Sequence, residues 1–355
     1  MKKFFLITFS FVFLAVFMAG CRGDQNKNQD PNKVTVMIYS EYFDPSMLTD
    51  FQMKTGYKLH LELYEAQEEM ISKIQTSGNS QYDVIIASDV VIPQLIRLGF
   101  IGKIDTNQVF NRRNIAEQFL NPPYDTTDEY SVPYLWGTTG ILYRDTTLSP
   151  SKVSYNTLLD EKRNKGSFSL LDESRSMLSM ALMAKGYDAN STDPEQIKAA
   201  AEYIKGITRS KNFLGFDGSV SGKNKVLSRL NWAAVVFNGE AMAAMTEDPT
   251  LQFAIPIEGS FMWVDAMLLS SKAPNPEGAY AFMNYILDTK TGAKLAKYIN
   301  YATPNKSSLN IIDSVFKKNN VVNPTRGDIS RLVFLKDVGE AVEFYDQAWE
   351  YIKRR

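Results

Sequence analysis

Short strand-like and helix-like segments alternate through the first third of the chain. The strands are apolar and rich in β-branched residues, and each helix-like segment ends at or near a glycine, as helices commonly do. In chain order, the predicted strands and helices are 33–40, 46–56, 57–65, 68–78, 82–88 and 91–101. This β-α-β-α-β-α order indicates a mostly parallel sheet with helices on both faces. Ligands of such sheets bind outside the carboxyl ends of the strands.

The segment EYSVPYLWGTTGILYR, residues 129–144, interrupts this alternation. It reads as extended chain, and we expect it to carry the polypeptide into a second lobe. Strand and helix patterns continue beyond it, and the C-terminal stretch 328–355 is predicted to be helical. A chain of 355 residues suits one large domain or two ordinary ones. We therefore predict an α/β fold with two lobes and a ligand cleft between them.

Scarce histidine and cysteine narrow the functions that this chain can perform. His60 is the only histidine and Cys21 the only cysteine, which leaves too few ligands for a Cys/His zinc site. His60 lies in the alternating segment 57–65, where we interpret it as an ordinary strand residue. The sequence contains no dinucleotide-binding or P-loop glycine motif. A net charge of −1 gives no reason to expect a nucleic-acid partner.

The N-terminus has the pattern of an export signal. Lys2 and Lys3 precede an apolar run that leads through small residues to Cys21. We interpret residues 1–20 as a signal peptide, Cys21 as a lipidated cysteine and 21–33 as a polar, flexible tether. No later apolar segment has the length needed to span a bilayer. The sequence therefore predicts a protein of the periplasm or cell envelope, tethered to a membrane through the lipid on Cys21.

Carboxylates and aromatic rings gather at the predicted strand ends and turns. Asp265 is a lone charge within the apolar run 261–269, where burial is costly unless a partner is present. Carboxylates accept hydrogen bonds from a cation, and aromatic faces attract cations and pack against methylene groups. This composition suits an organic cation with a hydrocarbon body. The candidate residues are Tyr39, Glu41, Tyr42, Ser88, Trp136, Asp172, Glu173, Phe237, Trp263, Asp265 and Tyr301.

Several of these residues would also suit roles outside a ligand site. Tyr39 and Tyr42 could be core residues, and a buried Arg or Lys could neutralise Asp265. Asp172 and Glu173 could simply occupy the acidic start of a helix. Two acids could also serve a glycosidase, although no pair here has a signature spacing. A structural surface lipoprotein is a further alternative, and so is a binding protein for a sugar, an amino acid or ferric iron.

Several short motifs, in the same order, resemble the spermidine/putrescine-binding proteins of bacterial polyamine ABC transporters. The most specific are YSVPYLWGTTGI, MWVDAMLL, YATPN and DVGEAVEFY, and the similarity runs from about residue 34 to the C-terminus. The resemblance implies a type II periplasmic-binding-protein fold, whose lobes close on the ligand. It also implies a monomer without enzymatic activity or cofactor that delivers polyamines to a membrane permease. The lobes implied are 34–138 with about 262–310, and 139–261 with about 311–355.

The resemblance also implies a role for each matched site residue. Acids would pair with the ammonium groups, aromatic rings would line the methylene chain, and Ser88 would contact the ligand at a strand end. The acids are Glu41, Glu173 and Asp265, and the aromatic residues are Tyr39, Tyr42, Phe237, Trp263 and Tyr301.

The sequence departs from the family pattern at several positions of this site. Tyr39 and Phe237 replace tryptophans, and Ser176 replaces an acid. Val90 stands where the family has a tyrosine, and the family's glutamine would fall near Leu335. Because three amines need more acceptors than two, these losses favour putrescine slightly over spermidine.

Overall fold

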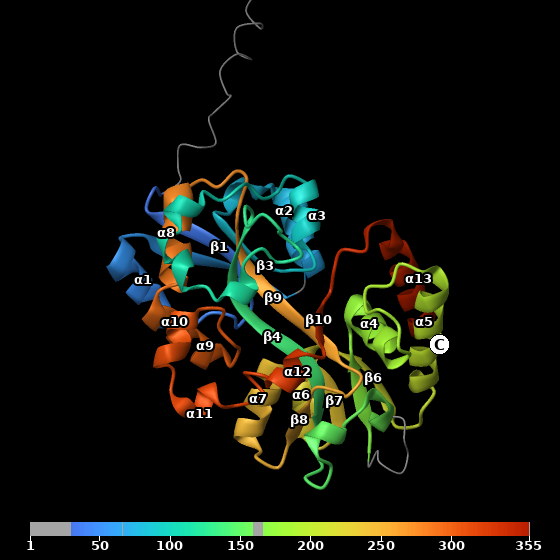
Figure 1. Ribbon diagram of the computed structural model, residues 1–355. Helices are drawn as coiled ribbons and strands as arrows, with labels where there is room; N and C mark the ends of the chain where they lie inside the picture. Colours follow the sequence, from blue (N-terminus) through green and yellow to red (C-terminus); the bar gives the residue numbers. More distant parts are fainter. Residues whose placement is uncertain (1–29, 66, 159–165, 355) are drawn as a thin grey trace, which may run out of the picture.

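The computed structural model describes residues 30–65, 67–158 and 166–354 (Figure 1). The predicted signal peptide, the lipidation site Cys21 and all but the last residues of the tether lie outside the described residues. The strands are β1 (Lys33–Tyr39), β2 (Lys58–Tyr64), β3 (Val84–Ser88), β4 (Ser131–Tyr143), β5 (Phe168–Leu171), β6 (Phe213–Asp217), β7 (Ala233–Phe237), β8 (Gln252–Ala254), β9 (Ser260–Leu269) and β10 (Leu332–Phe334).

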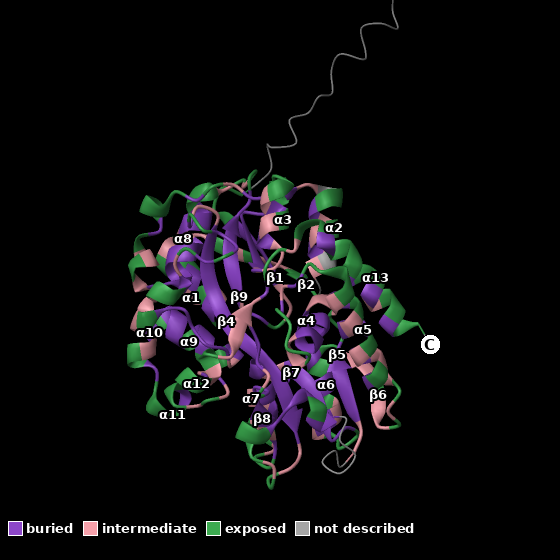
Figure 2. Ribbon diagram, turned by 45° about the vertical axis from the view of Figure 1, so that its right-hand side comes forward, coloured by how far each residue is buried: buried purple, intermediate pink, exposed green. Residues whose placement is uncertain are grey.

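Helices cover the strands, with short 3-10 turns between them (Figure 2). The helices are α1 (Met47–Thr55), α2 (Gln67–Ser77), α3 (Ile92–Arg97), α4 (Ser174–Ala184), α5 (Pro194–Thr208), α6 (Ser219–Leu227), α7 (Asn238–Glu247), α8 (Pro276–Ile286), α9 (Thr289–Ile299), α10 (Lys306–Ile311), α11 (Ser314–Lys317), α12 (Arg326–Ile329) and α13 (Val342–Lys353). Helix boundaries follow local signals: Gly56 adopts positive φ directly after α1, and Gly99 does so two residues after α3, close to where the sequence predicts these helices to end.

Each lobe is built on parallel strands that are completed by antiparallel ones. In the first lobe β1 pairs in parallel with β2 and β3, and β3 then pairs antiparallel with β9. In the second lobe β5 pairs in parallel with β6 and β7, and β7 pairs antiparallel with β4. The predicted two-lobed α/β fold is confirmed. Both sheets are mixed, because the antiparallel strands β9 and β4 complete the first and the second sheet, respectively.

The strands β4 and β9 tie the two lobes together. Residues 131–138 of β4 pair with β9 in the first lobe, and residues 139–143 of the same strand pair with β7 in the second. All residues of β4 are buried, and Figure 1 shows β4 and β9 running side by side across the middle of the molecule. The extended segment 129–144 therefore connects the lobes as the sequence predicts.

The buried apolar residues form separate clusters on either side of this connection. The first cluster draws on residues 34–136 and 264–322, and the others on residues 141–255 and 345–352. Ile312, Phe316 and Val322 pack with the first cluster. The exact lobe boundaries given by the sequence stay predictions.

One element differs from its prediction. The sequence pattern predicts helix throughout 328–355, yet residues 332–334 form β10, which pairs in parallel with residues 260–262 of β9. The helix resumes at α13, whose Tyr345 and Ile352 are buried in the second-lobe core. A three-residue strand has too little sequence to show a period, and the free edge of β9 is what makes this segment extended.

Among residues 30–65, 67–158 and 166–354, no helix is both long enough and apolar enough to cross a membrane.

We expect Asn238→Ala to lower the free energy of unfolding by about 1–3 kcal/mol, because it leaves the buried Thr138 N–H and the partly buried Val321 carbonyl without this partner. Asn238 is fully buried; its Oδ1 accepts from the Thr138 N–H at 2.9 Å, and its Nδ2 donates to the Val321 carbonyl at 2.9 Å. The matched control is Asn156→Ala, since Asn156 is exposed and, among the described residues, its side chain accepts from Tyr203 Oη alone. Denaturant unfolding measures both variants, and equal losses would contradict this role of Asn238.

Candidate functional site

The carboxyl ends of strands from both sheets meet at the middle of β9. β1 ends at Tyr39 and β3 ends at Ser88, and Ser88 lies directly opposite Asp265 in the antiparallel ladder with β9. From the second lobe, β7 ends at Phe237, whose ring contacts Trp263 of β9. Sites of open α/β sheets lie at such strand ends, so the topology brings the predicted residues of two lobes to one place.

Asp265 is the buried acid of this site. Asp265 is 5% exposed, and Tyr42 Oη donates a hydrogen bond of 2.8 Å to Asp265 Oδ2. Burial raises the pKa of Asp265 to about 7; the Tyr42 hydrogen bond opposes this rise, and the charge of Glu173 adds to it. Among the described residues, no Lys, Arg or His forms an ion pair with Asp265. The alternative of a neutralising protein cation therefore finds no support in the described part of the chain.

The aromatic residues predicted for the site form one continuous chain of ring contacts. Centroid distances are 5.9 Å for Tyr39–Tyr42, 5.9 Å for Tyr42–Tyr301, 4.9 Å for Tyr301–Trp263 and 5.6 Å for Trp263–Phe237. Every contact is edge-to-face, which aromatic rings prefer over a direct face-to-face sandwich. The chain begins at β1 of the first lobe and ends at β7 of the second.

Two glycines allow these rings to approach the backbone. A Cβ atom at Gly239 would lie 2.4 Å from atoms of the Tyr301 ring, and one at Gly137 would lie 2.4 Å from Trp263. Both distances are shorter than real contacts, so a side chain at either position would displace a ring of the site. Neither glycine stands out in the sequence, because the close approach involves rings that are distant along the chain.

The remaining predicted acids are exposed. Glu173 precedes α4 as its N-cap residue and accepts a hydrogen bond of 2.7 Å from Ser176 Oγ. Glu41 is exposed and has a positive φ of 58°, in the turn between β1 and α1. Asp172 forms an ion pair with Lys353 of α13 at the surface, so it serves the second lobe and not this cluster. Tertiary structure thus separates Asp172 from the adjacent Glu173.

Trp136 is part of the core next to the site. Its ring packs on Phe119, and its backbone N–H donates to the Ala302 carbonyl at 3.0 Å. This bond holds the turn that carries Tyr301.

Residues that sequence reasoning missed support the aromatic chain from behind. The ring of Tyr64 packs on Tyr39 with centroids 4.3 Å apart, and Tyr134 Oη donates to the Tyr42 carbonyl at 2.7 Å. Gln67 donates from Nε2 to Tyr39 Oη. Tyr64 ends β2, so its position at a strand end could have revealed it. Burial raises the pKa values of Tyr39 and Tyr42 well above their usual range, which keeps both phenols neutral hydrogen-bond donors.

The chemistry of this cluster suits a ligand that brings its own positive charge. In the described ranges, no group of three His, Cys, Asp or Glu residues is arranged to hold a metal ion. His60 lies in β2 at the surface, 3.8 Å from Glu62, away from the aromatic chain. An uncompensated buried carboxyl group next to aromatic faces favours an ammonium group bound to a hydrocarbon chain.

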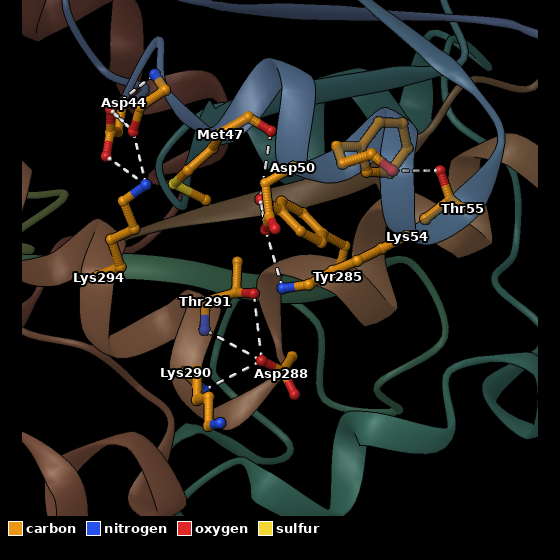
Figure 3. A network of polar contacts seen from close by, with 12 residues as sticks. Asp44, Met47, Asp50, Lys54, Thr55, Tyr285, Asp288, Lys290, Thr291 and Lys294 are labelled. Carbon is orange, nitrogen blue, oxygen red and sulfur yellow. Dashed lines mark hydrogen bonds and ion pairs between the residues drawn. The ribbon is translucent and has the colours of Figure 1, made fainter.

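A hollow between α1, α8 and α9 has a different character (Figure 3). Its charged residues are mostly engaged with each other: Lys54 pairs with Asp50 at 2.8 Å, and Lys294 pairs with Asp44 at 3.4 Å. Tyr285 Oη donates to Asp50 at 2.8 Å. The Tyr285 and Lys294 contacts link α1 and the residues before it to α8 and α9, whereas the Lys54–Asp50 pair lies within α1. Such solvated ion pairs contribute only a little stability each.

We expect Gly239→Ala to lower the thermal midpoint and to change tryptophan emission, because the added methyl group displaces Tyr301 from Trp263. Overpacking of this kind typically costs about 1–3 kcal/mol. Gly206→Ala is the matched control, since Gly206 is also helical but faces open space. It should stabilise the protein by up to about 1 kcal/mol and leave the emission unchanged. A Gly239→Ala protein with native stability and emission would contradict this packing.

Sequence comparisons extend over almost the whole chain. A model of the bacterial extracellular solute-binding protein family matches residues 46–324. The spermidine/putrescine-binding periplasmic protein 1 of Haemophilus influenzae is 31% identical over 363 residues, which cover 99% of each chain. The spermidine/putrescine-binding periplasmic protein of Salmonella typhimurium is 30% identical over 315 residues, or 89% of this chain and 90% of its own.

The fold is shared with a solved member of the same group. The spermidine/putrescine ABC transporter substrate-binding protein PotD of Streptococcus pneumoniae superposes with a TM-score of 0.79 at 27% identity, covering 91% of this chain and 100% of its own. These matches confirm the predicted fold and the resemblance noted in the sequence, and they make the chain a solute-binding protein rather than an enzyme. The chain belongs to the bacterial extracellular solute-binding proteins, in the family of the spermidine/putrescine-binding periplasmic proteins.

Proposed function

We propose that this protein binds polyamines outside the cytoplasm and delivers them to the membrane permease of an ABC importer. The observation that carries the proposal is the Asp265 carboxyl group, which is buried among aromatic rings and has Tyr42 as its hydrogen-bond donor. Burying a charge is costly unless an opposite charge accompanies it. A polyamine supplies that charge, and its methylene groups match the apolar rings beside it. The curated relatives named for spermidine and putrescine support the same ligand class.

In this proposal each side chain has a distinct task. Asp265 accepts from a terminal ammonium group, and Tyr42 holds the carboxylate in place from its other side. Trp263, Tyr301 and Phe237 line the methylene chain together with Tyr39. Ser88 lies opposite Asp265 and adds a hydroxyl group at the strand end.

The acids of the proposed site differ in how firmly they are held. Glu173 lies on the second lobe and Glu41 on the turn after β1, and both are exposed. We propose that they pair with the ammonium group at the far end of the ligand.

We further propose a slight preference for putrescine over spermidine. Ser176 stands where related proteins have an acid, and its hydroxyl group donates to Glu173 instead of accepting from a ligand amine. Leu335 is an apolar, buried residue near the place of a polar glutamine. Both changes remove acceptors that a third amine would use, whereas a diamine needs acceptors only for its two terminal ammonium groups.

Attachment to a membrane is part of the same proposal. The export signal and Cys21 together suit a lipoprotein whose lipid holds the binding domain in the periplasm or cell envelope. A tether of about a dozen polar residues would leave the two lobes free to reach the permease.

Calorimetry with the mature domain tests the ligand and the site together. We expect putrescine and spermidine to bind with micromolar or tighter affinity, which corresponds to roughly −8 kcal/mol. Asp265→Asn should weaken binding by roughly 100-fold, because an ammonium group loses its charged partner in a dry site. Trp263→Ala should also weaken binding, since the ring covers the methylenes.

The control is Asp83→Asn, at the opposite end of β3, where Asp83 is buried but already accepts from the Thr35 and Asn275 N–H groups. Its folded form should bind both amines normally. Absence of binding by either amine, together with a thermal shift on adding maltose or glutamate, would overturn the proposal. Normal binding by both site variants would place the site elsewhere.

Lipidation is tested by expressing the full chain in a bacterium fed an alkyne-labelled fatty acid. The wild-type protein should incorporate the label and sediment with membranes, because two acyl chains anchor a protein stably. Cys21→Ser should incorporate no label and appear in the soluble fraction or as uncleaved precursor. Equal labelling of both proteins, or no labelling of the wild type, would rule out Cys21 as the anchor.

A further inference from the structure

Asp89 is a second buried acid beside Asp265. It directly follows β3 and is 1% exposed. Its backbone N–H donates to the Val264 carbonyl at 2.9 Å, which places it one residue beyond the Ser88–Asp265 pair of the ladder. The two acids therefore sit on neighbouring strands at the same carboxyl edge of the first-lobe sheet.

Only one oxygen of the Asp89 carboxyl group has a partner. Ser88 Oγ and the Val90 N–H donate to Oδ1 at 2.9 and 3.0 Å, whereas Oδ2 is buried and accepts no hydrogen bond within the described residues. An asparagine could make the same two bonds through its carbonyl oxygen, so the local turn does not require a carboxylate. A buried polar atom without a partner costs about 1–3 kcal/mol. The Val264 N–H also lies near this carboxyl group and favours its charged form, but Oδ2 has no hydrogen bond of good geometry within the described residues, and an ammonium group of a ligand would supply one.

No positive charge of the described residues compensates either acid. Neither Asp89 nor Asp265 takes part in an ion pair in the described ranges. The titratable groups that face the two acids from β1, β2, β4 and the loops around them are other acids or neutral phenols. They are Tyr39, Tyr42, Tyr64, Tyr124, Tyr134, Glu173 and Tyr301.

The electrostatics of the pair agree with this geometry. Burial raises the pKa of Asp89 to about 8; the Ser88 hydrogen bond opposes this rise, and the charge of Asp265 adds to it. Since the pKa of Asp265 is about 7, both carboxyl groups are partly protonated near neutral pH when no cation is bound. The two acids titrate as a pair, because ionising one disfavours ionising the other.

We propose that Asp89 is a ligand-binding residue, and that the Asp89–Asp265 pair releases protons when an ammonium group binds. This inference rests on the proposed binding of polyamines at Asp265. The O–H bond of a neutral carboxylic acid breaks, its proton passes to the solvent, and the ammonium group keeps its own protons as it takes the place of that proton. Asp89 lies at the Asp265 end of the site, so it strengthens the hold on one terminus and leaves the preference for a diamine unchanged.

The affinity for the ligand should increase as the pH rises. At low pH the ligand must displace protons from the pair, so affinity should rise by roughly tenfold or more from pH 6 to pH 7. It should level off above about pH 9, where the pair is mostly ionised, while the amines stay charged up to about pH 10. The folding stability of the ligand-free protein should change in the opposite direction. Because both folded pKa values exceed the unfolded ones, its stability falls as pH rises from about 4 to about 8.

Calorimetric titrations of the mature protein with putrescine, in phosphate and in imidazole buffer at pH 6, 7 and 8, count the protons released. We expect about one proton per ligand at pH 7. Asp89→Asn keeps the local turn and should bind about tenfold more weakly, with fewer protons released. Asp83→Asn, just before the same strand and similarly buried, should match the wild type in both affinity and proton count.

The wild-type titrations need no variant, so the proposal stays testable if Asp89→Asn fails to fold. Tight binding whose affinity and heat are independent of pH and buffer would overturn this inference and leave polyamine binding intact. An Asp89→Asn protein that matches the wild type in affinity and proton release would overturn it as well. Absence of putrescine and spermidine binding at every pH would instead overturn the proposed function on which it rests.

Discussion

The burial of the Asp265 carboxyl group is the constraint around which the site is arranged. A carboxylate in an apolar strand loses its hydration, and the single hydrogen bond from Tyr42 returns only part of that energy. The carboxyl group stays buried because β9 pairs with β3 on one side and with β4 on the other. Such a strand cannot rotate its charge towards water. Asp265 is therefore held in a fixed position, and in the proposed function a cation of the ligand compensates its charge.

The same pair of long strands decides how the two lobes share the site. β4 pairs with strands of both sheets, and β9, which carries Trp263 and Asp265, pairs with β4 along residues 262–268. Glu173, in contrast, belongs to the second lobe and starts a helix that packs on α5 and α13. A movement between the lobes would change the distance from Glu173 to Asp265 far more than the distance from Tyr42. This arrangement combines one rigid acid with one adjustable acid, which suits a ligand that is charged at both ends.

Aromatic packing and backbone access are linked in this site. The ring chain from Tyr39 to Phe237 needs Gly137 and Gly239, because side chains there would overlap Trp263 and Tyr301. Asn238, next to Gly239, joins β4 to the Val321 carbonyl and so fixes the backbone on which these rings rest. Polar groups thus position the rings, while the rings themselves exclude water from Asp265. The Asp265 carboxyl group and the aromatic residues are thus connected by contacts through Tyr42.

Local patterns in the sequence determined much of this structure. Alternating strands and helices with glycine stops predicted the α/β lobes, and an apolar run with one charge singled out Asp265 before any contact was known. Short motifs also identified the family, since their residue order is a direct property of the chain.

Contacts between distant segments were decided only by the tertiary structure. β10 is a strand because it pairs with the free edge of β9. Asp172 forms an ion pair with Lys353, whereas the adjacent Glu173 lies near the site. Asp89 follows β3 in the sequence, but only the fold buries it near Asp265 and leaves one of its oxygens without a partner among the described residues. Burial and electrostatic coupling depend on which residues surround a group in space, and the linear order of the chain does not specify those neighbours.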